Sequence, residues 1–204
     1  MTLALTRRQT ILATLVATAL PGIAVAQGDP RIGERVMGAP DAPVTLVEYA
    51  MFTCPHCKHF QETVFPQIKA NYIDTGKVRL VFREVYFNRP SLWAGIIARC
   101  APKERYFGLA DLLFARQADW AAAVNEQEML AKLYAIGRQA GLSDDQMNAC
   151  LQDRALAEGL VADYQGKVTA DGVDGTPTFF IDGRKVPNGS YQEMAAALDA
   201  ALGA

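Results

Sequence analysis

The chain has 204 residues, 50% of them hydrophobic, and a formal net charge of −2. Its 20 lysine and arginine residues are outnumbered by 22 aspartate and glutamate residues and form no basic patch, which argues against nucleic-acid binding. The length and the apolar fraction suit one globular domain, and an even number of cysteines, four, points towards thiol chemistry.

The first 26 residues have the pattern of a secretory signal peptide. Arg7 and Arg8 give a positive start, and the apolar stretch that follows is too short to span a membrane as a helix. An A-x-A cleavage site ends at Ala26, so we expect the mature chain to begin at Gln27. The two arginines also resemble a twin-arginine export signal, so this route and the general secretory route both stay open. Either route leads out of the cytoplasm, and we expect a periplasmic protein.

The next part of the chain predicts a short lead, a strand and a helix. Residues 27–43 are rich in glycine and proline, which predicts a loose N-terminal lead with one short strand near residues 35–37. The apolar run 44–50 predicts a buried strand. Soon after it, apolar side chains recur at helical spacing, as at Phe60 and Val64, so a helix should follow the strand directly.

Cys54-Pro55-His56-Cys57 lies where this strand gives way to this helix. Two cysteines separated by two residues can bind zinc, attach haem, form a structural disulfide or exchange between dithiol and disulfide. Zinc needs four ligands, commonly two such pairs, and haem attachment needs histidine directly after the second cysteine, where this chain has Lys58. A disulfide in so short a loop is strained and reducible. The motif therefore favours redox exchange without a metal or another cofactor.

The position of the motif assigns a role to each of its residues. Pro55 suits the first helical position, which leaves the Cys54 sulfur near unpaired backbone N–H groups at the positive end of the helix. A thiolate is stabilised there, so we expect Cys54 to be the more exposed nucleophile and Cys57, one turn further in, its buried partner. His56 can add positive charge or a hydrogen bond next to the thiolate, unless it is an ordinary surface histidine.

The remaining chain divides clearly into elements. A second strand is predicted at residues 77–83, a helical region at about 91–170, and two strands joined by an Asp-Gly turn within residues 178–186. Capping residues followed three positions later by Glu or Gln predict the starts of three helices: Asn125 with Glu128, Ser143 with Gln146, and Ser190 with Glu193. The order is therefore strand, helix, strand, then helices, then strand, strand, helix.

This order matches the α/β thioredoxin fold with a helical insertion between its two halves. From about Gly38 to the C-terminus, the chain resembles the DsbA family of periplasmic thiol:disulfide interchange proteins, in its single-domain thioredoxin-like branch. The resemblance rests on the cysteine motif at residues 54–57 and on residues 175–183, Gly-Thr-Pro-Thr-Phe-Phe-Ile-Asp-Gly. It implies that residues 44–204 form a thioredoxin-like domain with the helical insertion at about 91–170.

The resemblance also implies further site residues. The family's cis-proline loop matches Thr176 and Pro177, and this loop faces the cysteine pair, where its backbone can bind an extended substrate chain. Thr176 stands where the family's best-known member has valine and the related isomerases have threonine. Glu48 matches the family's buried acid, which assists proton transfer, and Arg83 is a candidate partner for it. The alternative for Glu48 is a strand-edge glutamate that faces water.

The other two cysteines lie far apart in the helical region. In an exported chain with four cysteines, Cys100 and Cys150 predict a second, structural disulfide, and two buried free thiols are the alternative. Such a bridge would lie outside the catalytic site and would take no part in the exchange.

The sequence thus predicts an oxidase that donates the Cys54–Cys57 disulfide to newly exported polypeptides with free thiols. The resemblance adds a membrane oxidase of the DsbB type that restores the disulfide, a low pKa of the nucleophilic cysteine and a strongly oxidising potential. A disulfide isomerase or reductase of the same fold is one alternative, which Thr176 favours, although the lead at 27–43 is too short for the dimerisation domain that such isomerases usually carry. A non-enzymatic chaperone or metal-binding module is another alternative. We expect a monomer.

Overall fold

The computed structural model describes residues 28–203, so the signal-peptide prediction for residues 1–26 lies outside the described residues. The strands are β1 Arg35–Met37, β2 Val44–Ala50, β3 Val78–Glu84, β4 Thr178–Ile181 and β5 Arg184–Val186. The helices are α1 Pro55–Thr63, α2 Phe65–Ile68, α3 Arg89–Cys100, α4 Tyr106–Ala115, α5 Gln117–Trp120, α6 Glu126–Gln139, α7 Asp144–Gln152, α8 Arg154–Ala170 and α9 Tyr191–Leu202. A π-helical turn, Lys69–Ile73, follows α2, and a 3₁₀ turn, Lys103–Arg105, precedes α4.

Within the described part of the chain, no helix has the length and the apolar character that crossing a membrane requires.

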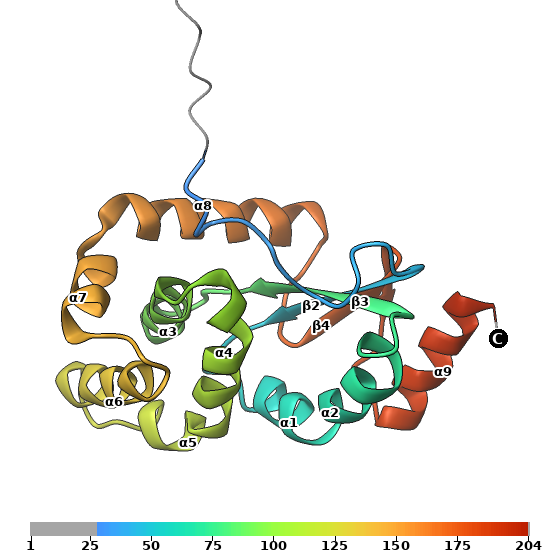
Figure 1. Ribbon diagram of the computed structural model, residues 1–204, viewed down its shortest axis with the longest axis horizontal. Helices are drawn as coiled ribbons and strands as arrows, with labels where there is room; N and C mark the ends of the chain where they lie inside the picture. The colour runs from blue at the N-terminus through green and yellow to red at the C-terminus, as the bar shows by residue number, and fades with distance from the viewer. Residues whose placement is uncertain (1–27, 204) are drawn as a thin grey trace, which may run out of the picture.

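The strands form one mixed five-stranded sheet in the order β1-β3-β2-β4-β5 (Figure 1). β2 and β3 run parallel, with Glu48 opposite Phe82, and the chain passes between them through α1 and α2. β4 runs antiparallel to β2, with Glu48 opposite Phe179, so an early and a late part of the chain meet at the centre of the sheet. This arrangement, with the helical insertion, confirms the predicted thioredoxin-like α/β fold.

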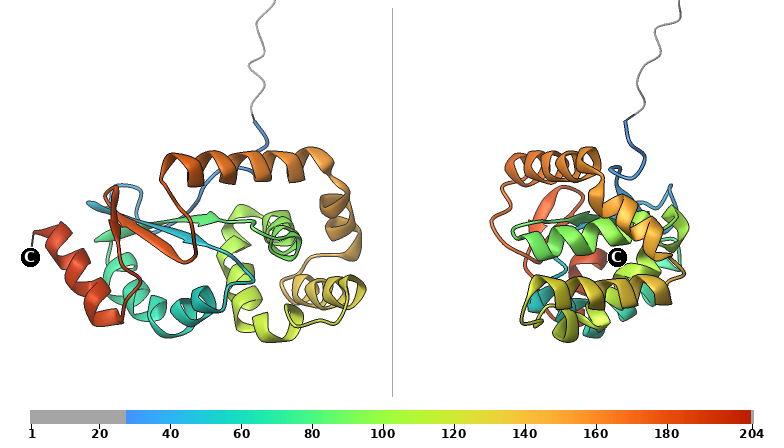
Figure 2. Two further views of the ribbon diagram at one scale, coloured as in Figure 1. Left: turned by 180° about the vertical axis from the view of Figure 1, so that it is seen from behind. Right: turned by 90° about the vertical axis from the view of Figure 1, so that its left-hand side faces the viewer.

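Alternation of side chains along β2 divides the core between the two faces of the sheet. Leu46 belongs to the main core, which α1, α2 and α9 cover, and Glu48 points to the same face because it is two residues further along the strand. Val47 and Tyr49 point to the opposite face, where they pack with Val168 of α8. Figure 2 shows α8 on one side of the sheet, with α1, α2 and α9 on the other. Both faces of β2 are therefore covered, which explains why an acidic residue on this strand is buried.

The predicted helix caps are present, with one difference. The capping boxes that begin at Ser143 and Ser190 are complete in the structure. Asn125 accepts a hydrogen bond from the backbone N–H of Glu128 at 2.8 Å, as predicted for an N-cap. The Glu128 side chain, however, accepts from the backbone N–H of Val124 at 3.1 Å. This third site is therefore an N-cap without the reciprocal bond of a capping box.

Cys100 and Cys150 are joined by a disulfide in the structure. Their Cα atoms lie 6.1 Å apart, and the bridge spans 50 residues of sequence. Since Cys100 ends α3 and Cys150 lies on α7, the bridge connects two helices of the insertion. Cys54 and Cys57, in contrast, are both free thiols at the start of α1.

The strand expected near residues 35–37 is present as β1, and residues 28–34 before it are held in place by charged contacts. Arg31 forms ion pairs with Asp29, at 2.5 Å, and with Asp153, the N-cap of α8, at 2.6 Å. The backbone carbonyl group of Arg31 accepts a hydrogen bond from Arg99 on α3. The segment is thus attached to α3 and α8 at once, through contacts with residues that are far away in the sequence.

Arg99 also belongs to a buried charge network between the sheet and the insertion. Its guanidinium group forms an ion pair with Glu84 at the end of β3, and both side chains are almost inaccessible to solvent. Tyr106 on α4 donates a hydrogen bond to the other oxygen of Glu84 at 2.7 Å, and Arg35 stacks over the Tyr106 ring at 5.0 Å. The network therefore connects β1, β3, α3 and α4 by polar contacts inside an otherwise apolar core.

Candidate active site

Cys54 lies where the chain leaves β2 and enters α1. It is the N-cap of α1, with an extended backbone (φ −82°, ψ 120°), and Pro55 occupies the first turn. Its N–H donates to the carbonyl group of Met51 at 2.9 Å, and its carbonyl group accepts from the N–H of Lys58 at 3.1 Å. Because proline tolerates the first helical position and fixes φ there, the sequence holds the Cys54 sulfur at the open, positive end of α1.

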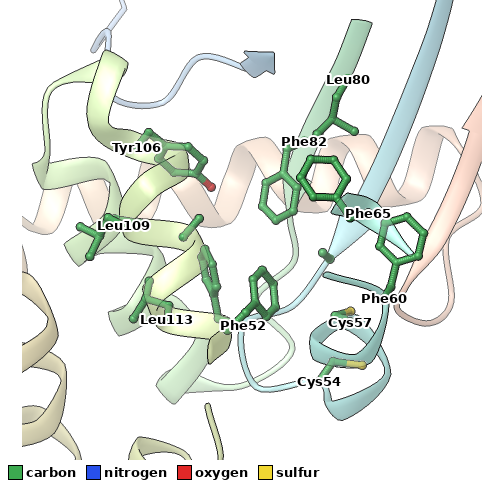
Figure 3. Close-up of a cluster of buried hydrophobic side chains, with 14 of the residues drawn as sticks. Phe52, Cys54, Cys57, Phe60, Phe65, Leu80, Phe82, Tyr106, Leu109 and Leu113 are labelled. Carbon is green, nitrogen blue, oxygen red and sulfur yellow. The ribbon is translucent and has the colours of Figure 1, made fainter. Parts of the chain in front are cut away.

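Cys57 lies in the first turn of α1 and is the deeper of the two cysteines. Its exposed fraction is 0%, whereas Cys54 retains 6%. Figure 3 shows the two sulfurs at the edge of the aromatic core, close to Phe52 and Phe60. Cys54 is therefore the cysteine of the pair that an incoming sulfur atom can reach.

The pKa values of the two thiols are shifted in opposite directions. Hydrogen bonds lower the pKa of Cys54 to about 5, first from the Cys57 side chain, then from the Thr176 side chain and from the backbone N–H groups of Cys57 and His56, while burial acts in the other direction. Burial raises the pKa of Cys57 well above its usual range, and the neighbouring Cys54 and Glu48 add to this effect. At neutral pH the pair therefore holds one thiolate, at Cys54, and one thiol, at Cys57.

The loop before β4 approaches Cys54 from the other side of the site. The peptide bond between Thr176 and Pro177 is cis. The carbonyl oxygen of Thr176 accepts a hydrogen bond from Cys54 Sγ at 3.2 Å, across 122 residues of sequence. The antiparallel pairing of β4 with β2 brings this loop to the cysteines. An extended chain that pairs with the loop would therefore have its side chains beside Cys54.

Thiolate absorbance of the reduced protein should titrate with a midpoint of about 5. This pKa lies far below the ~8.5 of an unfolded cysteine, so ionised Cys54 stabilises the reduced, folded protein, and the contribution is complete above pH ~8.5. The contribution is lost as the pH falls from ~8.5 to about 5, so the stability of the reduced form should decrease between these two values. A Cys54→Ser variant is the control and should lack the transition. A midpoint near that of a free cysteine would contradict the assignment.

Glu48 is fully buried, with an exposed fraction of 0%, which excludes the water-facing alternative. Its two carboxyl oxygens accept hydrogen bonds from Nε2 of Gln61, at 2.9 and 3.0 Å. Burial raises the pKa of Glu48 to about 8, although the Gln61 hydrogen bond lowers it. Its charge in turn raises the pKa of Cys57. A carboxyl group with these properties can give and take a proton near neutral pH.

Arg83 is not the partner of Glu48, and this part of the prediction is wrong. Arg83 stands opposite Tyr49 in the parallel pairing of β2 and β3, so it points to the face that α8 covers. There it forms ion pairs with Glu34 and Asp171, both at 2.8 Å. Glu48 points to the opposite face because adjacent residues of a strand alternate.

His56 is exposed, and so is Pro55. Among the hydrogen bonds of the described residues, none involves the His56 imidazole, and the contribution of His56 to the Cys54 thiolate comes from its backbone N–H. The proposed role of the His56 side chain therefore stays a prediction.

Two glutamines of this site are missed by sequence reasoning. Gln117, the first residue of α5, is buried, and its Nε2 donates to the carbonyl groups of Phe52 and Cys54 at 2.7 and 2.9 Å. Nothing in the local sequence marks it, because its partners lie 65 and 63 residues away. Gln61 stands four residues after Cys57, on the same face of α1, and this spacing is a signal that could have identified it.

Comparison with known protein families gives one broad match. A family described as Thioredoxin matches residues 31–200, which include both cysteines of the motif and the Thr176–Pro177 loop. A protein of Rickettsia bellii named protein-disulfide oxidoreductase is 34% identical over 170 residues, which cover 83% of this chain and 64% of that protein. The chain thus spans less than two thirds of the length of this relative.

Two further relatives are covered over more of their length. Disulfide bond formation protein D of Bacillus subtilis is 28% identical over 191 residues, which cover 86% of this chain and 80% of that protein. The crystal structure of Wolbachia pipientis alpha-DsbA1 matches with a TM-score of 0.76 and 29% identity, covering 83% of this chain and 91% of that structure.

Proposed function

Because this chain belongs to the thioredoxin family, with protein-disulfide oxidoreductases and DsbA proteins among its relatives, we propose that it is an oxidase that donates its Cys54–Cys57 disulfide to polypeptides with free thiols. The observation that carries the proposal is the set of hydrogen bonds that lower the pKa of Cys54. These bonds stabilise the thiolate that is present only after the disulfide has been given away. Stabilising the reduced form makes the disulfide a stronger oxidant.

The exchange proceeds in two steps. A substrate thiolate attacks Sγ of Cys54, the Cys54–Cys57 bond breaks, and Cys57 leaves with the electron pair and takes a proton from the Glu48 carboxyl group. A second substrate thiolate then attacks the substrate sulfur of the mixed disulfide, and Cys54 leaves as its stabilised thiolate. The substrate has lost two electrons and gained a disulfide, and the Cys54–Cys57 pair has gained both electrons.

The proposed setting is the periplasm. The pattern of residues 1–26 supports export by the general secretory or the twin-arginine route, with cleavage after Ala26. The substrates would then be newly exported polypeptides, and a membrane oxidase of the DsbB type would restore the disulfide. We propose that the protein works as a monomer.

A disulfide isomerase is the second candidate, and Thr176 is the observation that favours it. The Thr176 side chain hydrogen-bonds the Cys54 sulfur and lowers its pKa. The Thr176 side chain therefore influences the same redox equilibrium, between the Cys54–Cys57 disulfide and the dithiol, as the backbone donors of α1. We give the donors of the helix more weight because they act on the thiolate whatever residue precedes the proline.

One assay with two substrates separates the candidates. The oxidised protein is mixed in parallel with a reduced, unfolded enzyme and with the same enzyme carrying scrambled disulfides, and the regain of enzyme activity is followed. We expect fast oxidation of the reduced substrate and little rescue of the scrambled one. Efficient rescue with feeble oxidation would show an isomerase instead. A Thr176→Val variant should change the balance only modestly, and a complete exchange of activities would mean that the loop decides the function.

A further inference from the structure

Gln61 is the one hydrogen-bond partner of the Glu48 carboxyl group among the described residues. Gln61 also lines a surface pocket of about 340 Å³ between α1, α2 and α4, together with Phe65, Asp111 and Phe114. Glu48 itself does not reach this pocket. Gln61 therefore lies between a fully buried acid and the protein surface, half-buried on its own helix.

The groups around Glu48 come from several elements. On α1, Gln61 donates hydrogen bonds to it, and its charge raises the pKa of the Cys57 thiol. On the neighbouring strands, the residues opposite Glu48 are Phe82 of β3 and Phe179 of β4. Across the pocket, α4 contributes Asp111 and the segment after α2 contributes Lys69. The immediate surroundings of the carboxyl group are thus aromatic on the sheet and polar only on α1.

We propose that Gln61 is a positioning residue for thiol exchange, which orients the Glu48 carboxyl group for proton exchange with Cys57. This inference rests on the exchange proposed above. An amide N–H₂ group that donates to both oxygens fixes the orientation of the carboxyl group and favours its ionised form.

The direction of the effect follows from the charge that the amide stabilises. Without the donor, the ionised form of Glu48 would have no partner in its apolar surroundings, so its pKa should rise further above its usual range. Reoxidation of the pair requires Cys57 to give its proton to ionised Glu48 before it attacks Cys54. A higher pKa means that less Glu48 is ionised at neutral pH, so this step should become slower.

The step can be isolated with glutathione. Reduced protein is mixed with oxidised glutathione at low pH to form the mixed disulfide at Cys54, and the pH is then raised. Cys57 loses its proton to Glu48 and attacks Sγ of Cys54, the bond to glutathione breaks, and glutathione leaves with the electron pair as a thiolate. The rate of glutathione release is measured as a function of pH.

In a Gln61→Leu variant, the inflection of this pH profile should move to higher pH, and the rate at pH 7 should fall about tenfold. A Gln67→Leu variant is the matched control and should behave like the unmodified protein, since Gln67 is exposed and donates only to the Thr63 carbonyl group of its own helix. In a Glu48→Gln background, Gln61→Leu should have no further effect, because Gln61 acts through Glu48.

An unmoved inflection in Gln61→Leu, or an equal slowing in the Glu48→Gln background, would overturn the proposal. Carbon NMR of the Glu48 carboxyl group gives a second measurement that does not depend on turnover, and its titration should shift in the same direction. Release of glutathione tests a single step that an oxidase, a reductase and an isomerase share. The glutathione result therefore tests the role of Gln61 even if the oxidase assay fails.

Discussion

A Cys54→Ser variant should lose all measurable disulfide donation, a fall of at least ~100-fold, whereas a Cys57→Ser variant should accumulate mixed disulfides when it attacks disulfide-bonded proteins. The reason is that the two sulfurs differ in solvent accessibility and in pKa. Cys54 is the sulfur that a substrate can reach and the one that ionises at low pH, while Cys57 is fully buried and its pKa is raised. Cys57 alone would present neither an accessible sulfur nor a thiolate.

Mass spectrometry under non-reducing conditions measures both outcomes. Each reduced variant is incubated with a disulfide-bonded substrate protein. Cys54→Ser should give no adduct, whereas the Cys54 thiolate of Cys57→Ser should attack the substrate disulfide and give a one-to-one adduct, because no Cys57 thiol is present to displace the substrate. A Cys100→Ser/Cys150→Ser double variant is the control and should retain exchange, because the second bridge lies within the helical insertion. Substantial donation by Cys54→Ser would refute the assignment of the nucleophile.

An Arg99→Met variant should lose about 3–5 kcal/mol of folding free energy. The substitution leaves Glu84 as an uncompensated buried charge, and it also removes the donor to the backbone of Arg31. Urea unfolding followed by circular dichroism measures the loss. Because the penalty comes from the orphaned charge, a Glu84→Gln/Arg99→Met double variant should recover part of the stability.

The control for this prediction is Arg154→Met. Arg154 pairs with Glu158 on the surface of α8, where both side chains are mostly exposed, so its removal should change the unfolding curve little. Equal effects of the two arginine substitutions would mean that the buried network contributes no more than a surface pair.

The parts of the fold that the sequence predicts well are those fixed by neighbours in the chain. The apolar run before Cys54, the proline after it and the helical spacing of Phe60 and Val64 are local patterns, and together they place a strand, an N-cap and a helix. The complete capping boxes at Ser143 and Ser190 are local in the same sense.

The parts that escape prediction depend on contacts between distant segments. Glu84 and Arg99 are an acid and a base among many in the sequence, and only the packing of α3 on β3 makes them a buried pair. The same holds for Gln117, whose two carbonyl partners belong to another half of the fold. For Glu48, the sequence suggests a partner on the neighbouring strand, but the strand register sends Arg83 to the opposite face.

The pairing of β4 with β2 has a consequence for the order in which the protein becomes reactive. Synthesis produces Cys54 and Cys57 early, but Thr176, whose side chain lowers the pKa of Cys54, lies 122 residues later in the chain. Closing a loop of that size is entropically costly. A chain emerging from its N-terminus therefore carries cysteines without the Thr176 contribution to their acidity until synthesis is nearly complete. The full acidity of Cys54 is therefore a property of the finished chain.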